Sequence, residues 1–332
     1  MEENKMANLH SEFITFHDRV ALTSGKKESL RTARNAIRER IRKYFRENLK
    51  VTLLKFLGQG SYAMGTTVNP LDGEFDIDDG VYLQHLDEND DSEWPTPDTI
   101  HRWLVKATVG HTNEMPLDKR TCVRVRYAGQ YHVDLPSYGK LNGEYLLAEK
   151  GLKGWHRSDP LALTVWFIKH VKDQSEQLRR VVLYLKAWAD FQSGRRGKMP
   201  SGLILTVLAA QNFRSDRRDD MSLAYTAAAI TSTVFPVFCL YNPVDREEEL
   251  TAHMTDEQKT RFQEAISDLA YDAINAIDND DREEASKLWR RQLGERSPNT
   301  KKAIKIGQEQ EDAAKLAAAY GAKNPPKPWV HS

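Results

Sequence analysis

The sequence predicts an α+β fold in which a lobe with a mixed β-sheet is followed by an all-helical lobe. Short β-rich segments alternate with helical ones up to about residue 158, and the periodicity is helical from there on. The chain has 332 residues, enough for two hydrophobic cores. The expected units are N-terminal helices over residues 1–50 that pack across both lobes, a first lobe over 51–158, a helical lobe over 159–320, and a mobile Pro-rich tail over 321–332.

Before the first lobe, a basic helix is expected over residues 27–46, because apolar residues recur there at helical spacing. Ser24-Gly25 is interpreted as a break before this helix. The elements expected next are a strand over 51–57, a helical turn over 63–66, a strand over 75–83, a helix over 99–109, a hairpin of strands 121–127 and 130–135 that turns at Ala128-Gly129, and a short strand over 146–149.

The helical lobe is expected to start at Pro160, which suits a first helical turn, with Ser158 or Asp159 as the N-cap. Gly194 to Pro200 is interpreted as a basic loop. The expected helices cover residues 161–172, 175–191, 201–213, 219–231, 255–279 and 281–293.

Composition excludes several classes of protein. Apolar residues make up 40% of the chain, and no apolar run reaches the roughly 18 residues that cross a bilayer. The charged N-terminus lacks the apolar region of a secretory signal. Cys122 and Cys239 are the only cysteines, too few for a disulfide framework or a Cys-based zinc site. We therefore expect a cytoplasmic protein with no membrane partner.

The charges sum to zero, 48 basic against 48 acidic residues, but they are segregated. Residues 71–100 carry eleven acids and no Lys or Arg, whereas residues 169–218 carry eleven bases against four acids. Most such charges belong to solvated helix faces. The pattern also suits a cleft in which acids hold metal and bases hold phosphate. A net charge of zero argues against long-range electrostatic attraction of the whole protein to nucleic acid, so no nucleic-acid activator is expected.

The chemically informative segment is Phe75-Asp76-Ile77-Asp78-Asp79-Gly80. Residues i and i+2 of a strand point to one face, so Asp76 and Asp78 lie side by side and require a cation between them. Asp134 lies on another expected strand, and if the two strands are neighbours the three carboxylates can hold two divalent ions. Asp79 points to the opposite face, where a structural role is expected.

Two further features of the sequence accompany these acids. Gly60-Ser61, at the mouth of a turn, offers backbone N–H groups and a hydroxyl to phosphate oxygens. His132 shares the face of Asp134, and we expect it to be a packed residue behind the metal ligands. A calcium loop is disfavoured because Gly80 comes one position early, and a kinase because no H-R-D or D-F-G triplet is present.

The ordered set of these motifs resembles the polymerase-β-type nucleotidyltransferases. It is most similar to the cGAS/DncV-like nucleotidyltransferases (CD-NTases) of bacterial CBASS antiphage systems, and among them to the DncV type that makes cyclic GMP–AMP. The matching segments are Gln59-Gly60-Ser61, residues 75–80, Val133-Asp134-Leu135-Pro136, Gly154-Trp155 with Ser158-Asp159-Pro160, Leu185-Lys186-Ala187-Trp188 and Lys198-Met199-Pro200-Ser201. The resemblance implies a polymerase-β-like lobe with a mixed sheet and a C-terminal helical-bundle lobe.

The resemblance also implies the roles of individual residues. Asp76, Asp78 and Asp134 would be the catalytic residues that hold two Mg²⁺ ions, with Mn²⁺ as the alternative. The nucleotide-binding residues would be Gln59, which lines the nucleotide pocket, Gly60 and Ser61, which bind the donor triphosphate, and Lys186 and Ser201, which reach its phosphates from the helical lobe.

The expected activity is the joining of NTPs into a cyclic dinucleotide, cyclic GMP–AMP from ATP and GTP, as a second messenger for antiviral defence that a separate CBASS effector senses. The related family includes members conjugated to a partner through the C-terminus, but the chain ends in Trp329-Val330-His331-Ser332 without the small final residue that such coupling favours. The alternatives are a nucleotidyltransferase that modifies RNA or a protein, and a catalytically silent nucleotide-binding scaffold.

Overall fold

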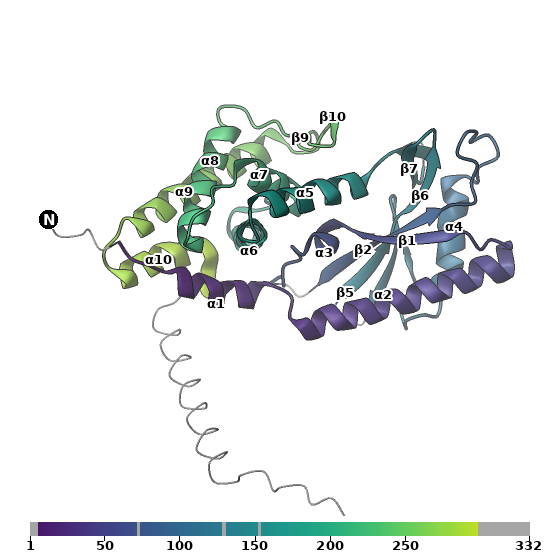
Figure 1. Ribbon diagram of the computed structural model, residues 1–332, viewed down its shortest axis with the longest axis horizontal. Coiled ribbons are helices and arrows are strands. Elements are labelled where there is room, and N and C mark those ends of the chain that lie inside the picture. Colours follow the sequence, from purple (N-terminus) through teal and green to yellow (C-terminus); the bar gives the residue numbers. More distant parts are fainter. Residues whose placement is uncertain (1–5, 72–73, 128–130, 152–153, 298–332) are drawn as a thin grey trace, which may run out of the picture.

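The computed structural model describes residues 6–71, 74–127, 131–151 and 154–297, which form two lobes side by side (Figure 1). The fold class predicted from the sequence is confirmed, since a mixed sheet with two covering helices is followed by a helical bundle. Of the described helices, none is both long and apolar enough to cross a bilayer.

The first lobe is built on a mixed sheet whose strand order is β3-β4-β5-β2-β6-β7-β8, with β1 paired to β2. The central strand β2 runs parallel to β5 and β6, and the other pairs are antiparallel. The strands are β1 (Leu54–Gln59), β2 (Phe75–Leu83), β3 (Leu117–Asp118), β4 (Val123–Tyr127), β5 (Tyr131–Leu135), β6 (Ser137–Leu141), β7 (Glu144–Glu149) and β8 (Gly154–Arg157).

Helices α2 (Ser24–Tyr44) and α4 (Pro97–Thr108) share a hydrophobic core with the sheet, to which Ile37 and Ile41 of α2 and Val81 of β2 contribute. A π-helical turn, Phe45–Leu49, continues α2. Alternation along β2 places Ile77, Asp79 and Val81 on this covered face, so Asp76 and Asp78 face the other way, towards the second lobe.

The helical lobe has a core of its own, centred on fully buried Trp188 and Trp289. Trp188 is thus a packed core residue. The elements of this lobe are α5 (Pro160–Gln174), α6 (Gln177–Arg196), α7 (Gly202–Asn212), α8 (Asp219–Val234), the hairpin β9 (Tyr241–Asn242) and β10 (Asp245–Glu249), α9 (Asp256–Ile277), α10 (Arg282–Leu293) and a 3₁₀ turn at Gly294–Arg296.

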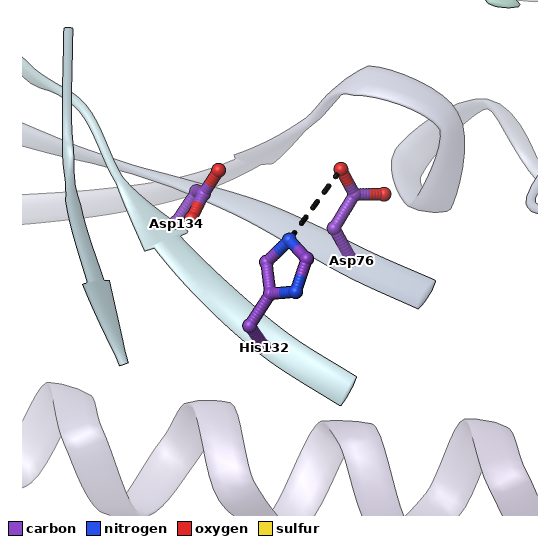
Figure 2. A group of neighbouring side chains, drawn as sticks. All are labelled: Asp76, His132 and Asp134. Atoms are coloured by element: carbon purple, nitrogen blue, oxygen red, sulfur yellow. Dashed lines mark ion pairs between the residues drawn. The ribbon is translucent and has the colours of Figure 1, made fainter. Parts of the chain in front are cut away.

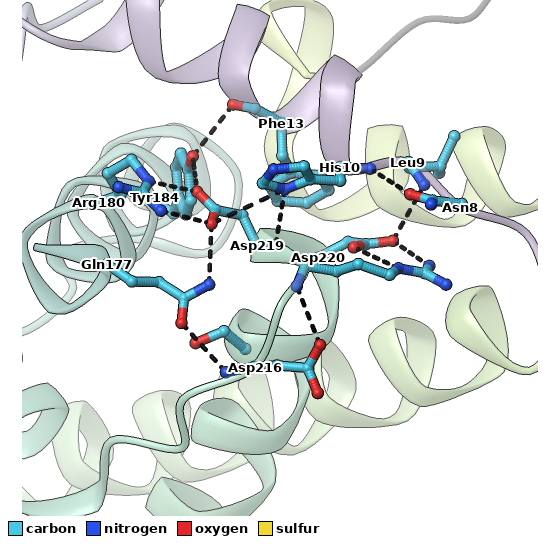
Figure 3. Close-up of polar contacts among 12 residues, drawn as sticks. Asn8, Leu9, His10, Phe13, Gln177, Arg180, Tyr184, Asp216, Asp219 and Asp220 are labelled. Carbon is cyan, nitrogen blue, oxygen red and sulfur yellow. Dashed lines mark hydrogen bonds and ion pairs between the residues drawn. The ribbon is translucent and has the colours of Figure 1, made fainter. Parts of the chain in front are cut away.

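Helix α1 (His10–Val20), which no sequence pattern singled out, packs on α6 and α8 and belongs to the helical lobe. A buried polar network fixes it there (Figure 3). The Asp219 carboxylate accepts two hydrogen bonds from Arg180 at 2.6 and 2.8 Å and one from the Tyr184 hydroxyl at 2.8 Å. Burial would raise the pKa of Asp219, but these hydrogen bonds lower it. Asp219 of α8 therefore contacts α6 through its carboxylate and α1 through its backbone N–H, which donates to His10 Nδ1 at 3.0 Å.

Several element boundaries differ from the prediction. Ser24 and Gly25 lie within the first turn of α2, not before it, because Thr23 is the N-cap and accepts from Lys26 N–H at 3.3 Å. The segment expected to form a basic loop from Gly194 begins three residues later, since α6 continues to Arg196. Helix α3 (Gly60–Met64) starts three residues before the predicted turn. The turn expected at Ala128-Gly129 and the predicted Pro-rich tail lie outside the described residues.

Candidate active site

The three predicted acids are brought together by the parallel pairing of β2 with β5. In this register Asp76 lies opposite His132 and Asp78 lies opposite Asp134. Side chains at paired positions project from the same face of a sheet, so all four residues line one surface. Figure 2 shows Asp76, His132 and Asp134 around a common space.

The three carboxylates lie close together but differ in their exposure to solvent. Burial, together with the charges of Asp76 and Asp134, raises the pKa of Asp78 to about 7. Asp134 is 7% exposed, whereas the side chain of Asp76 is 46% exposed and faces the cleft. Like charges in such a place are stable together when a cation lies between them.

The donor atoms fit a divalent metal ion. Asp76, His132 and Asp134 each offer one ligand atom, and these atoms lie within 4.8 Å of one another. Burial, and next the charge of Arg124, lower the pKa of His132. This favours the neutral imidazole, which is the form that binds a metal. Asp78, which lies opposite Asp134, would add a further carboxylate ligand.

Arg124 of β4 is a site residue that sequence reasoning missed. Its Nε and Nη2 donate to the two oxygens of Asp134, both at 2.7 Å. The hydrogen bonds to Asp134 raise the pKa of Arg124, so the guanidinium stays charged. The pair fixes the orientation of Asp134 and offsets part of the negative charge of the cluster. The alternation Val123-Arg124-Val125 was a usable signal, because it marks a strand with charged residues on one face.

Gly60 and Ser61 lie at the start of α3, directly after β1. Gly60 adopts a φ of +65°, in the left-handed region that favours glycine. The Ser61 hydroxyl lies 3.0 Å from the hydroxyl of Thr67, which is close enough for a hydrogen bond. Both residues line the interlobe cavity beside Asp76 and Asp78, as the sequence predicts for a phosphate-binding turn.

Gln59 also lines the cavity, but its amide is already hydrogen-bonded. Its Nε2 donates to the Tyr138 hydroxyl at 2.9 Å, and its Oε1 accepts from the Tyr82 hydroxyl at 3.3 Å. The side chain is 5% exposed. Gln59 therefore supports the floor of the cavity, and a contact with nucleotide would replace one of these hydrogen bonds.

Lys186 reaches the cavity from α6 of the helical lobe. Its ammonium donates to the backbone carbonyl of Thr66 at 3.2 Å and to the Thr66 hydroxyl at 3.1 Å. Burial lowers the pKa of Lys186 to about 8, an effect that the charge of Asp76 opposes. The amine is thus held between the lobes with neutral partners, and an anionic ligand would bind it more strongly.

Ser201 is not among the residues that line the cavity. It is exposed and is the N-cap of α7, where its hydroxyl accepts from Ile204 N–H at 3.4 Å. The cavity is lined instead by the next turn of α7, at Gly202, Leu203 and Thr206. Ser201 therefore has a structural role as an N-cap, and its predicted contact with phosphate stays a prediction.

The cavity between the lobes has a volume of about 450 Å³. Its polar lining includes Ser61, Asp76, Asp78 and Lys186, and its apolar lining includes Leu163 and Leu203. A cavity lined by acids, a lysine and apolar side chains suits a metal-bound phosphate ester that carries an aromatic base.

Two family models match this chain, one on each lobe. Residues 54–138 match the nucleotidyltransferase domain of DncV-like cyclic GMP-AMP synthases, and residues 175–306 match the C-terminal domain of cyclic GMP-AMP synthase. The chain belongs to the DncV-like nucleotidyltransferases. This confirms the family predicted from the sequence, and with it a nucleotidyltransferase of the cyclic oligonucleotide synthase type.

Individual relatives of this DncV-like chain agree with the assignment. A cyclic AMP-AMP-AMP synthase of Acinetobacter sp. is 26% identical over 283 residues, which is 81% of this chain and 79% of the relative. The fold matches Vibrio cholerae DncV, a cyclic AMP-GMP synthase in complex with a linear intermediate, with a TM-score of 0.73 and 21% identity over 90% of this chain and 98% of that one. Escherichia coli DncV in a 3′-deoxy GTP bound form matches with a TM-score of 0.71 and 20% identity, covering 85% and 94%.

Proposed function

We propose that this DncV-like enzyme joins ATP and a second NTP into a cyclic oligonucleotide by metal-dependent nucleotidyl transfer. The observation that carries the proposal is the convergence of Asp76, Asp78 and Asp134 on one face of the sheet, beside a cavity that Lys186 enters from the other lobe. We also propose residues 51–158 and 159–320 as the functional lobes, because the chain passes between them after β8.

The residues of the chain have distinct tasks in this reaction. Asp76, Asp78 and Asp134 would hold two divalent ions, Mg²⁺ or Mn²⁺, which supply charge neutralisation and lower the pKa of the attacking hydroxyl. Gly60 N–H, the Ser61 hydroxyl and Lys186 bind the donor triphosphate, and Lys186 exchanges Thr66 for phosphate oxygens.

Each transfer step forms one P–O bond and breaks one. A ribose hydroxyl of the acceptor attacks the α-phosphorus of the donor and gives up its proton to solvent, the bond from the α-phosphorus to the bridging oxygen breaks, and pyrophosphate leaves. The linear product then binds again and its own hydroxyl attacks the remaining triphosphate, which closes the ring and releases a second pyrophosphate. Positioning and charge neutralisation account for most of the acceleration.

The proposed product is cyclic GMP–AMP from ATP and GTP, which the DncV family models and the Vibrio cholerae fold match support. A second candidate is cyclic AMP-AMP-AMP, because the Acinetobacter relative that carries this name is 26% identical. ATP is a substrate in both cases. The proposed role is to supply a second messenger to a separate effector in antiviral defence, with no nucleic-acid activator and with the C-terminus available to a regulatory or conjugating partner.

The test is to incubate purified full-length protein with ATP alone, GTP alone, both, and all four NTPs, each with Mg²⁺ or Mn²⁺, and to identify products by mass spectrometry. A cyclic product that requires ATP and GTP supports cyclic GMP–AMP, and one formed from ATP alone supports the trimer. Product that appears only on added RNA or protein would replace the proposal with a macromolecule-modifying enzyme. Nucleotide binding without turnover would indicate a silent scaffold, and a large stimulation by DNA or RNA would contradict the proposed independence from nucleic acid.

A further inference from the structure

His132 is a buried polar side chain without a partner beside the acidic site. It is 6% exposed, and neither ring nitrogen has a hydrogen-bond partner among the described residues. The nearest carboxylate oxygens are Asp76 Oδ2, 3.9 Å from Nε2, and Glu74 Oε2, 3.7 Å from Nδ1. Burial of a polar group without a hydrogen-bond partner is unfavourable, so this arrangement favours the binding of a ligand.

The ring is placed to meet such a ligand. β5 holds His132 directly opposite Asp76, two residues from Asp134 and on the same face. Figure 2 shows the imidazole between the two carboxylates with one nitrogen directed at Asp76. The ligand atoms of the three residues lie within 4.8 Å of one another, and Asp78 is not part of this group. The two ends of the acidic surface therefore differ in their donor atoms.

Arg124 limits how Asp134 can bind a metal ion. Both oxygens of Asp134 accept a hydrogen bond from Arg124 at 2.7 Å. Each carboxylate oxygen has two lone pairs, so one on each oxygen remains for a metal ion. Asp134 can thus bind an ion without losing Arg124.

We infer that His132 is a metal ligand and that Asp76, His132 and Asp134 form a nitrogen-containing ion position selective for a first-row transition ion such as Mn²⁺ over Mg²⁺. Mg²⁺ takes oxygen ligands and keeps several waters, whereas imidazole favours transition ions. The inference deepens the proposed function, because it concerns the metal site on which that function rests. It does not depend on which product is made, or on whether the product is cyclic.

The decisive experiment uses the metal alone. Mn²⁺ is added without nucleotide to full-length protein carrying ¹⁵N-labelled or unlabelled histidine, and pulsed EPR detects nitrogen bound to the ion. We expect a histidine nitrogen coupling that changes with the isotope, is lost in His132→Asn, and persists in His156→Asn, a control on β8 of the same sheet. Direct titration should show Mn²⁺ affinity about tenfold or more lower in His132→Asn, with Mg²⁺ affinity little changed.

Two results would overturn the inference: only oxygen ligands around Mn²⁺ in the wild-type protein, or a nitrogen coupling that survives in folded His132→Asn. Circular dichroism checks folding of the variant. If His132→Asn does not fold, the isotope-dependent coupling in the wild type decides between a histidine and an oxygen-only site, and Asp76→Asn tests its location. Because no nucleotide is present, a failure of cyclic product formation leaves this result unaffected.

Discussion

The carboxylate of Asp78 occupies the space that a side chain at Gly60 would need. A Cβ built at position 60 would lie 2.2 Å from Asp78 Oδ2, far inside van der Waals contact. The first residue of the proposed phosphate-binding turn and the central acid of the proposed metal site are therefore in close contact. A side chain introduced at position 60 would have to displace the carboxylate of Asp78.

Gly60→Ala is expected to displace Asp78 and to lower the rate of product formation by about 100-fold, the scale that a 1 Å misplacement produces. The positive φ of 65° adds about 1–3 kcal/mol of backbone strain. Steady-state kinetics and urea unfolding measure the two effects. Gly25→Ala is the matched control, since nothing lies within 4 Å of its added Cβ; equal losses in both variants would show that the fit to Asp78 is not the cause.

Asp78→Asn and Asp76→Asn are each expected to abolish product while the fold survives, because an amide cannot replace the charge of a metal-bound carboxylate. Product analysis with Mg²⁺ and with Mn²⁺ checks both variants. Asp91→Asn, at an exposed position of the same acidic stretch, should keep wild-type activity. Retained synthesis in either site variant would contradict the metal assignment.

Metal-free Asp78→Asn should also be more stable than the wild type, and increasingly so at higher pH. Folding raises the pKa of Asp78 from 3.8 to about 7. The contribution of Asp78 to the free energy of unfolding is therefore fully present below pH 4 and is lost as the pH rises through 7. We expect the variant to gain about 2–4 kcal/mol relative to the wild type between pH 5 and pH 8, at about 1.4 kcal/mol per pKa unit. Urea unfolding in EDTA at both pH values measures it, and a difference that does not change with pH would contradict this account.

Nucleotide affinity should weaken as Lys186 loses its proton. Burial lowers its pKa to about 8, so the ammonium is present below pH 8 and is lost above it. If the bound triphosphate keeps the lysine charged, the Kd for ATP rises about tenfold from pH 7 to pH 9, because one proton is taken up on binding. Lys186→Arg stays charged and should show no such rise. Calorimetric titration compares the two, and an equal pH dependence in both proteins would assign the titration to another group.

Asp79 is expected to be important for stability and not for chemistry. It is fully buried, and Arg38 of α2 donates to both of its oxygens, at 2.7 and 2.5 Å. Asp79→Ala leaves the guanidinium without its partner, at a cost of about 3–5 kcal/mol in unfolding free energy. Urea unfolding measures this loss, with Asp90→Ala as the exposed control. A specific activity that vanishes in folded Asp79→Ala would instead place this residue in the catalytic machinery.

The alternation of residues on β2 was predictable because it follows from local sequence. Phe75–Leu83 is a strand with the predicted boundaries, and it separates Asp76 and Asp78 from Asp79 as expected. The sequence predicts that Asp134 lies beside Asp76 and Asp78 if their two strands are neighbours. The parallel pairing of β2 with β5 meets that condition.

The contacts that depend on register were not predictable. The predicted two-residue turn at Ala128-Gly129 implies a register in which Tyr127 pairs with Gln130. In the structure Tyr127 pairs with Tyr131, which shifts the register of β4 and β5 by one residue. Because a shift of one residue changes which side chains share a face, the observed pairing of Arg124 with Asp134 could not be derived from the predicted turn. The position of α1 was also hidden, because its buried network joins residues far apart in sequence, such as His10 and Asp219.

The placement of α1 and α2 on different lobes has a mechanical consequence. Within the described residues, the chain passes between the lobes once at residues 21–23, between α1 and α2, and once at residues 158–159, between β8 and α5. We expect the cleft to open by rotation about a line near these two connections. Such a rotation would break the contacts that bridge the lobes, among them the hydrogen bonds of Lys186 and Arg179 to the backbone carbonyls of Thr66 and Met64.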